Sequence, residues 1–304
     1  MVRFRKPTQR SGDIIDRRGA SRGRPGGMAI GAGGGGVAII IAILFALFGG
    51  GGDGGGGGGL EDILNQLQPP TTSATETNPL DPSTDPQADM VDFMDVVIED
   101  NQALWTDVFA QSGREYQRAE LVLFTGFTES GCGGADSRMG PHYCPLDGRI
   151  YLDLEFFEEL SSRFGATGDL APAYVLSHEI GHHVQNLLGI DDQVRDLQQQ
   201  DPSQANDLSV RMELQADCFA GVWASTVFVG QLETGENLAL DPGEISEALE
   251  AAAAVGDDRI QETIQGRVDP ESFTHGTSEQ RQRWFQTGYD NGDPNPCDTF
   301  SGSI

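Results

Sequence analysis

The order of apolar and polar positions along the chain predicts a mainly helical domain. Two short apolar runs, residues 121–126 and 149–154, are bounded by turn residues and have the length of buried strands. Longer stretches repeat apolar residues at the spacing of one helix face: residues 88–110, 170–188, 207–229, 242–256 and the segment that begins at residue 278. We therefore expect an α+β fold that is mainly α, with a small strand region before the central helix.

Residues at the ends of these stretches are typical of helix caps and helix ends. Pro172 suits a first helical turn and Gly189 suits a helix end, so the central helix is expected from about residue 170 to residue 188. Thr277, followed three residues later by Gln280, forms a capping-box pattern that predicts a last helix. The Gln- and Asp-rich stretch after Gly189 is expected to be a linker.

The first 87 residues differ in composition from the rest of the chain. Residues 1–27 carry eight Arg or Lys against two Asp, and residues 28–48 contain no charge. As a helix, residues 28–48 would span about 31 Å, close to the roughly 30 Å hydrocarbon core of a bilayer. Residues 49–87 are rich in Gly and then in Pro and Thr, which predicts a flexible linker.

This pattern predicts four parts. They are a basic cytoplasmic tail (1–27), a single transmembrane helix (28–48), the linker (49–87) and a folded domain (88–304) outside the cytoplasm. The orientation follows from the positive-inside rule. A secretory signal peptide is the alternative for the apolar segment, but a run of glycines follows it instead of a small-x-small cleavage site.

The net charge of the chain excludes one class of partner. The chain carries a formal net charge of −28, and its 11 basic residues outside the tail are scattered arginines. Binding of nucleic acid requires a basic surface that neutralises phosphates, so we expect no nucleic-acid partner. An acidic surface keeps a domain soluble, and a preference for basic or neutral peptides is the alternative reason for the charge.

The four cysteines indicate an oxidising compartment. Cys132 and Cys144 flank a Gly-containing loop and lack the C-x-x-C spacing of a zinc site. Four cysteines allow three pairings, of which we expect Cys132–Cys144 and Cys218–Cys297. A lone core thiol at Cys218 is the alternative to the second pair. Disulfides persist mainly outside the cytoplasm, in agreement with the expected topology.

Candidate metal ligands lie in the middle of the central helix, in the sequence His178-Glu179-Ile180-Gly181-His182. Residues four apart on an α-helix share one face, so His178 and His182 can direct two imidazoles at one ion. Glu179 lies beside that face, where a carboxylate can take a proton from zinc-bound water. Gly181 lowers helix propensity, as expected where another helix approaches closely. Two ordinary helix histidines are the alternative, because the motif is short.

A third ligand is expected from the helix over residues 207–229. Catalytic zinc commonly takes three protein ligands and leaves a fourth position to water. Glu213 would be the third ligand, and Asp217 would accept a hydrogen bond from the outer nitrogen of His178. An acidic surface stripe is the alternative. Apolar neighbours such as Leu214 and Trp223 indicate instead a buried helix, where unpaired carboxylates are costly.

The chain resembles the neutral zinc metallopeptidase family of bacteria (YpfJ type) in the segments RFRKPTQRSGDIIDRRG, GCGGADSRMGPHYCP, HEIGHHVQ, RMELQADCFAGVWA and GTSEQRQRWF. The resemblance covers the basic tail and nearly all of residues 88–304. It implies a gluzincin-like zincin fold, in which H-E-x-x-H is followed by E-x-x-x-D on a later helix. It also implies a metalloendopeptidase with zinc as cofactor, held at the membrane of a bacterial cell and acting on peptides or proteins of the envelope.

The expected chemistry is hydrolysis of a peptide bond. Zinc would polarise the scissile carbonyl and lower the pKa of its water from about 15.7 to near 7, and Glu179 would carry the proton. His275 is the candidate oxyanion donor, with ordering of a turn as its alternative role. His183 is expected to be structural and His142 to lie in a loop. The strand over residues 149–154 could pair with an extended substrate.

Two other classes of function stay open at this point. The first is a zinc-stabilised scaffold that binds envelope proteins and has no peptidase activity. The intact Glu179 argues against this class, because a purely structural site would not need it. The second is a metal-dependent hydrolase that cleaves an amide bond of the cell wall. The chemical nature of the cleavage products would separate these classes.

Overall fold

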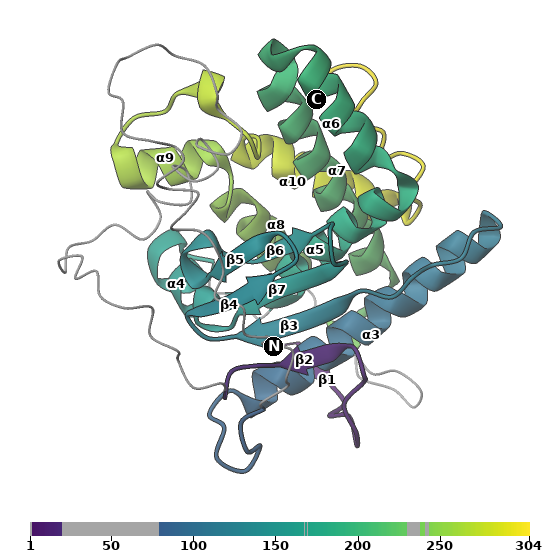
Figure 1. Ribbon diagram of the computed structural model, residues 1–304, viewed down its shortest axis with the longest axis vertical. Helices are drawn as coiled ribbons and strands as arrows, with labels where there is room; N and C mark the ends of the chain where they lie inside the picture. The colour runs from purple at the N-terminus through teal and green to yellow at the C-terminus, as the bar shows by residue number, and fades with distance from the viewer. Residues whose placement is uncertain (1, 20–78, 167, 169, 230–237, 241–242) are drawn as a thin grey trace.

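The computed structural model describes residues 2–19, 79–166, 168, 170–229, 238–240 and 243–304 (Figure 1). Its main sheet has four strands in the order β2-β3-β7-β6. Strands β2, β3 and β7 run parallel to one another, and β6 runs antiparallel to β7. The bounds of these strands are Ile14–Asp16 for β2, Glu120–Phe124 for β3, Arg149–Asp153 for β7 and His142–Cys144 for β6.

The remaining described strands form two smaller sheets. Strands β4 (Phe127–Ser130) and β5 (Gly133–Asp136) form a hairpin after β3. Strand β9 (Leu238–Leu240) pairs with β1 (Arg3–Phe4) on one side and with β8 (Phe228–Val229) on the other. The first residues of the chain therefore share one sheet with two strands that follow residue 227.

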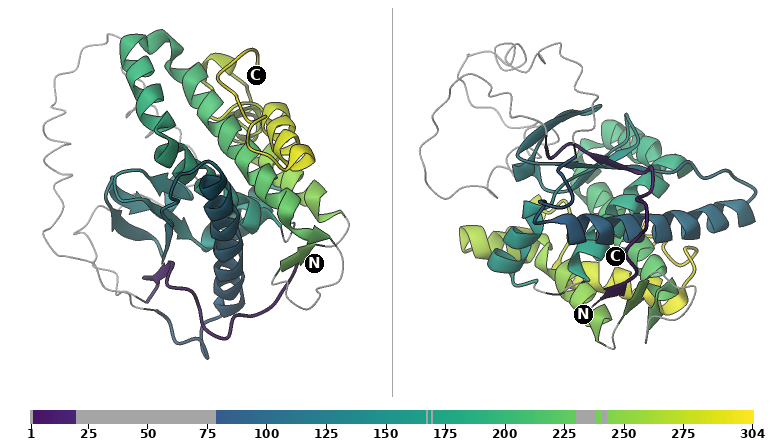
Figure 2. Two further views of the ribbon diagram at one scale, coloured as in Figure 1. Left: turned by 90° about the vertical axis from the view of Figure 1, so that its right-hand side faces the viewer. Right: turned by 90° about the horizontal axis from the view of Figure 1, so that it is seen from below.

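Eight α-helices in the described part of the chain lie mainly to one side of the sheet (Figures 1 and 2). The long helices α5, α7 and α10 pack on one another and carry the apolar core, which includes Trp223 and Phe285. The helices are α3 (Ala88–Gln111), α4 (Glu155–Phe164), α5 (Ala171–Leu188), α6 (Ile190–Gln200), α7 (Ala205–Thr226), α8 (Glu244–Ala254), α9 (Asp257–Gln265) and α10 (Ser278–Asn291), and short 3₁₀ turns lie at Ser137–Met139, Pro202–Gln204 and Pro270–Ser272.

The expected mainly helical α+β fold is confirmed, and so are several element ends. Helix α5 ends at Gly189, whose φ of 75° is easily adopted by glycine. Helix α10 begins with the predicted capping box, because Thr277 and Gln280 each bond the other's backbone N–H. The linker predicted after Gly189 is wrong, since that stretch forms α6 and buries Val194.

Two glycine contacts bring the central helices close together. A Cβ atom on Gly181 of α5 would lie 2.9 Å from the Cα of Ala216 in α7, so only glycine permits this approach. On the other side of α7, a Cβ atom on Gly288 of α10 would overlap the carbonyl of Cys218. These close approaches place the middle of α5 directly beside the middle of α7.

The prediction that the folded domain begins at residue 88 is wrong, because residues 2–19 also belong to it. Strand β2 pairs with β3 in register, from Ile14 beside Leu121 to Asp16 beside Leu123. Three basic residues of this segment, Lys6, Arg10 and Arg18, contact carboxylates of the domain, which the charge pattern alone could not indicate. Lys6 contacts Asp89 on α3, for example.

Most of the other N-terminal predictions concern residues outside the described part of the chain. The predicted transmembrane helix (28–48) and residues 49–78 of the predicted linker lie there. Among the described residues, no helix combines the length and the apolar character that a membrane crossing needs.

Both predicted disulfides are present, and together they use all four cysteines. Cys132 is bonded to Cys144 at the end of β6. Cys218 on α7 is bonded to Cys297 near the C-terminus, so the alternative of a lone core thiol is excluded. The second bond joins the helix that carries Glu213 to the last segment of the chain.

Arg18 is expected to be essential for the stability of the fold. Its side chain is 1% exposed and bonds the carboxylates of Asp16 and Asp85, each at 2.7 Å. Arg18→Met would leave two buried carboxylates without their cation, so we expect the free energy of unfolding to fall by about 3–5 kcal/mol. Urea unfolding followed by circular dichroism measures this difference.

Lys6→Met is the matched control, because it removes another cation of the same segment. The ion pair of Lys6 and Asp89 is exposed, and exposed pairs contribute little to stability. The urea midpoint of this variant should stay at that of the parent. Equal losses for Arg18→Met and Lys6→Met would contradict the expectation.

Candidate metal centre

The structure brings the three predicted metal ligands together. His178 and His182 come from consecutive turns of α5, and Glu213 comes from the facing turn of α7. Nε2 of His178 lies 3.1 Å from Oε2 of Glu213, and Nε2 of His182 lies 3.4 Å from Oε1. One ligand atom from each residue falls within 4.8 Å of the others. The close approach of α5 and α7 at Gly181 makes this arrangement possible.

The second nitrogen of each histidine is held by another side chain. Nδ1 of His178 lies 2.8 Å from Oδ1 of Asp217, and Nδ1 of His182 lies 2.8 Å from Oε1 of Gln185. Such partners hold Nδ1 as the protonated nitrogen and leave Nε2 with a lone pair. Two Nε2 atoms and one carboxylate are a donor set that suits catalytic zinc with an open fourth position. The residues present therefore fit the metal that the motif predicts.

Asp217 is the centre of a buried polar network that orients His178. Its carboxylate, fully buried, accepts a hydrogen bond of 2.6 Å from the Tyr174 hydroxyl as well as the one from His178. Arg281 of α10 donates to both oxygens, with Nε 2.8 Å from Oδ2 and Nη2 2.9 Å from Oδ1. The predicted place of Asp217 beside His178 agrees with this geometry.

Sequence reasoning missed Arg281, Tyr174 and Gln185. Gln185 lies three residues after His182, so helical spacing could have indicated it. No spacing rule joins Arg281 to Asp217, since 64 residues separate them. The motif GTSEQRQRWF marked the segment that carries Arg281 but not its partner.

Arg281→Met is expected to weaken zinc binding about 10- to 100-fold, the usual effect of removing an outer partner of a metal ligand. The variant frees the Asp217 carboxylate from two hydrogen bonds, so His178 loses its fixed orientation. Competition with a chromophoric chelator measures the zinc affinity. Arg283→Met on the same helix is the control, because that side chain is exposed. Arg281→Lys should restore only part of the affinity, since lysine lacks the two-pronged geometry. Unchanged affinity in Arg281→Met would refute the role.

The charges of the centre raise the pKa of its histidines in the metal-free protein. Burial alone would lower the pKa of His182, but the Glu213 carboxylate outweighs burial and raises the pKa to about 10. Burial is likewise outweighed at His178, whose pKa is raised by Asp217 and Glu213. The same contacts hold the pKa of Glu213 well below its usual range. Near neutral pH, the empty cluster therefore binds protons where zinc would bind.

Zinc affinity should consequently rise with pH throughout the neutral range. Zinc binds the lone pair of Nε2, so a proton on Nε2 of His178 or His182 must leave before the metal binds, while Nδ1 keeps its proton. Because the raised pKa of His182 is about 10, this competition weakens steadily as the pH increases toward that value. Calorimetry in buffers of different ionisation enthalpy should detect proton release on binding. A pH-independent affinity between pH 6 and 8 would contradict the expectation.

The other two predicted catalytic residues lie beside the cluster. Glu179 is buried on α5 at 7% exposure and interacts electrostatically with His182. His275 lies in the loop before α10, and Nδ1 of its ring is 3.1 Å from Oδ1 of Asp257. Burial alone would lower the pKa of His275, but Glu213 and Asp257 raise it. A cationic histidine near the ligands can donate a hydrogen bond to a developing negative charge.

The remaining histidines have structural contacts. His183 is buried, with Nδ1 3.0 Å from the Tyr143 hydroxyl and Nε2 2.6 Å from the carbonyl of Gln117, which agrees with its predicted structural role. His142 stacks on Tyr151. The prediction that His142 lies in a loop is wrong, because it begins strand β6.

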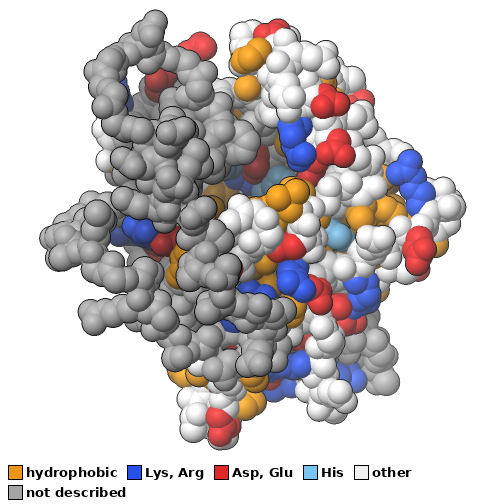
Figure 3. Space-filling view, viewed as in Figure 1, with side chains coloured by type: hydrophobic (Ala, Val, Ile, Leu, Met, Phe, Trp, Pro, Cys, Tyr) orange, Lys and Arg blue, Asp and Glu red, His pale blue; other side chains and the backbone are white. Residues whose placement is uncertain are grey.

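The strand predicted to receive substrate is not an edge strand. Strand β7 pairs with β3 on one side and with β6 on the other, so its backbone cannot bind a further strand. Strand β6 pairs only with β7 among the described strands. Tyr143 of β6 bonds both His183 and Asn186 of α5, which ties this edge to the helix of the metal ligands. On the face shown in Figure 3, histidine side chains lie in a recess beside acidic, basic and hydrophobic side chains.

The fold and this cluster define a protein with an H-E-x-x-H candidate metal site, in which a carboxylate is the third candidate ligand. Residues 2–300 match the sequence profile of the family described as "Putative neutral zinc metallopeptidase", and the chain belongs to this family. The chain is 48% identical to the uncharacterized protein YpfJ of Escherichia coli K12 over 237 residues, which are 77% of this chain and 79% of YpfJ.

A second relative comes from a different bacterium. The uncharacterized protein Mb2605 of Mycobacterium bovis is 49% identical over 192 residues, which are 62% of this chain and 64% of that protein. No solved structure matches the chain. The relatives therefore place the chain in the family without assigning a substrate.

Proposed function

We propose that this protein is a zinc metalloendopeptidase that hydrolyses peptide bonds. The observation that carries the proposal is the position of Glu179 beside a partly buried His-His-Glu cluster, in which Nδ1 of each histidine is already held by another side chain. Bound zinc supplies a polarised carbonyl and an acidified water near neutral pH. A site that served structure alone would have closed its fourth position with another protein ligand.

The chain's own residues would divide the remaining work. Glu179 takes the proton of the attacking water and delivers it to the leaving amine, as a positioned carboxylate does in general acid–base catalysis. His275 donates a hydrogen bond to the oxygen that becomes negative, and its contact with Asp257 fixes the ring. Asp217 and Arg281 keep His178 in place and do not touch substrate.

An extended peptide would bind along the free edge of β6. Main-chain hydrogen bonds to an edge strand give affinity without requiring a particular side chain. Support comes from the single pairing of β6 among the described strands and from the contacts of Tyr143 with α5. The sequence suggested residues 149–154 as the strand that pairs with substrate. Because both edges of β7 are already paired, we assign this role to β6.

The proposed place of action is the bacterial cell envelope, outside the cytoplasm. Two disulfides that use every cysteine of the chain support this location, because disulfides are rare in the cytoplasm. The substrates would then be peptides or proteins of the envelope. The acidic net charge of −28 gives no basis for a nucleic-acid partner.

The test uses the full chain, purified with zinc, on an unbiased mixture of peptides, with products read by mass spectrometry. We expect cleaved peptide bonds that disappear after removal of zinc by a chelator and return when zinc is added back. A parallel incubation with isolated cell wall tests an amide hydrolase. Release of wall fragments without peptide cleavage would favour that alternative, and no cleavage of either material at full zinc occupancy would favour a binding scaffold.

A further inference from the structure

Residues 2–19 are built into the domain through β1, through Phe4 and through β2. Strand β1 pairs with β9, and the ring of Phe4 packs 5.3 Å from that of Phe93 on α3. Strand β2 then forms one edge of the main sheet, beside β3. Figure 2 shows the purple N-terminal segment passing across α3 between these two sheets.

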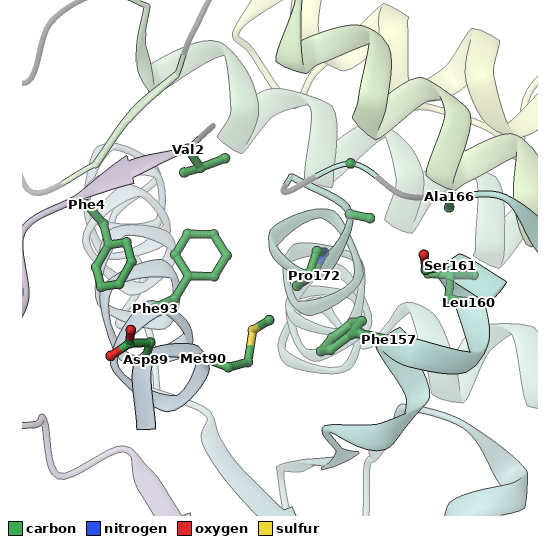
Figure 4. Close-up of a pocket in the computed structure, with 12 residues that line it drawn as sticks. Val2, Phe4, Asp89, Met90, Phe93, Phe157, Leu160, Ser161, Ala166 and Pro172 are labelled. Atoms are coloured by element: carbon green, nitrogen blue, oxygen red, sulfur yellow. The ribbon is translucent and has the colours of Figure 1, made fainter. Parts of the chain in front are cut away.

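The segment that crosses α3 donates hydrogen bonds to acidic side chains of that helix. Arg10 donates to Asp92 at 2.8 Å, and the backbone N–H of Ser11 donates to Asp95 at 2.9 Å. Val2 and Phe4 also form one wall of an apolar cavity of about 310 Å³ against Met90 and Phe93 of α3 (Figure 4). Basic residues that would otherwise mark a cytoplasmic tail are therefore used inside the fold.

A buried ion cluster joins the two ends of the segment over residues 20–78. Arg18 precedes this segment and Asp85 follows it, and their side chains are each 1% exposed. Nη1 and Nη2 of Arg18 bond Asp85 at 3.3 and 2.7 Å, while Asp16 bonds the same guanidinium. The neighbouring Arg17 is also buried and donates to Thr128 and to the carbonyl of Glu129. Arg18 and Asp85, which flank this segment in the sequence, thus lie side by side in the domain.

These contacts restrict the position of the chain relative to a membrane. The apolar residues 28–48 lie between the two ends, and one crossing there would place residues 2–19 and 79–304 on opposite faces of a roughly 30 Å hydrocarbon layer. Strand pairing and hydrogen bonds of about 3 Å cannot act across that distance. We propose that residues 2–19 and 79–304 lie on the same side of the membrane, in place of the single-pass topology that the basic tail suggested.

The two disulfides favour the extracytoplasmic side for both parts. Under this topology, the eight Arg and Lys of residues 1–27 do not act as a cytoplasmic retention signal. The inference is independent of the proposed peptidase activity, because it rests only on the contacts of residues 2–19 with the rest of the domain.

Labelling of single added cysteines in cells decides the question. Thr8→Cys and Gln199→Cys place a thiol on exposed positions of the N-terminal segment and of α6, and the native cysteines are all paired. A membrane-impermeant maleimide that adds a mass tag is applied to intact cells and to permeabilised cells. We expect both variants to react equally in intact cells. If both variants reacted equally but only after permeabilisation, the two parts of the chain would still lie on the same side of the membrane. That side would then be the cytoplasm.

Reaction of Gln199→Cys in intact cells with reaction of Thr8→Cys only after permeabilisation would overturn the proposal. A second measurement checks the contact itself. Lys6 is the only lysine of the chain, so a carbodiimide can form just one lysine amide with Asp89. We expect that cross-link in native membranes, and its absence in Lys6→Gln. Its absence from the parent protein would remove the contact on which the inference rests.

Discussion

Glu179→Gln is expected to lower the rate of peptide hydrolysis by about 10²- to 10⁴-fold, the range that a positioned general base contributes. Glutamine has nearly the same shape as glutamate but cannot accept the proton of the attacking water. The metal ligands are unaltered, so zinc affinity should stay near that of the parent. The loss should therefore lie mainly in kcat and only slightly in KM, because the interaction is made in the transition state.

The measurement combines peptide cleavage kinetics with metal analysis of the same preparations. Glu158→Gln makes the same chemical change at an exposed position of α4 and should cleave like the parent. Cleavage by zinc-loaded Glu179→Gln at the parental rate would exclude Glu179 as the base. It would also shift the proposal toward a different residue beside the cluster.

Glu213→Gln is expected to reduce zinc affinity by more than about 100-fold, beyond the 10- to 100-fold effect of an outer partner. Glu213 supplies the only negative charge among the three ligands, and its two oxygens face both Nε2 atoms. A neutral amide cannot compensate the charge of the ion. Its N–H₂ group also repels a cation at the position of one oxygen.

Two measurements check this expectation. Chelator competition gives the affinity directly. Thermal unfolding with and without zinc gives the stabilisation by the metal, which is about 2.7 kcal/mol when free zinc is 100 times the dissociation constant. The variant should show almost none of this increment at the same zinc concentration. Asp207→Asn, an exposed change on the same helix, should keep it. A full increment in Glu213→Gln would mean that another residue is the third ligand.

The fold was predictable where local pattern and burial agree. Helix α5 lies within one residue of its predicted bounds, because Pro172 and Gly189 act through the backbone of their own turns. The stretch that became α6 was misread, since its many Gln and Asp residues obscure the single buried contact of Val194. The strands of the N-terminal segment are two and three residues long, too short for an alternating pattern to be visible.

In the site too, local spacing predicted some features, and contacts between distant segments decided the others. The i, i+4 spacing alone places His178 and His182 on one face of a helix, and the same spacing relates Glu213 to Asp217. The meeting of the two helices depends on the approach of Gly181 to Ala216, and the link from Asp217 to Arg281 spans 64 residues. No local repeat in the sequence indicates the approach of the two helices or the link between Asp217 and Arg281.

By itself, the sequence determined the ligand types, their helical spacing and the mainly helical class. Each of these depends on residues that are neighbours in the chain or on composition. Only the tertiary structure decided that β6 is an edge of the main sheet among the described strands, that Arg281 holds Asp217 and that residues 2–19 belong to the domain. These features arise from pairings between distant segments, and their hydrogen bonds and buried charges leave no periodic trace in either segment.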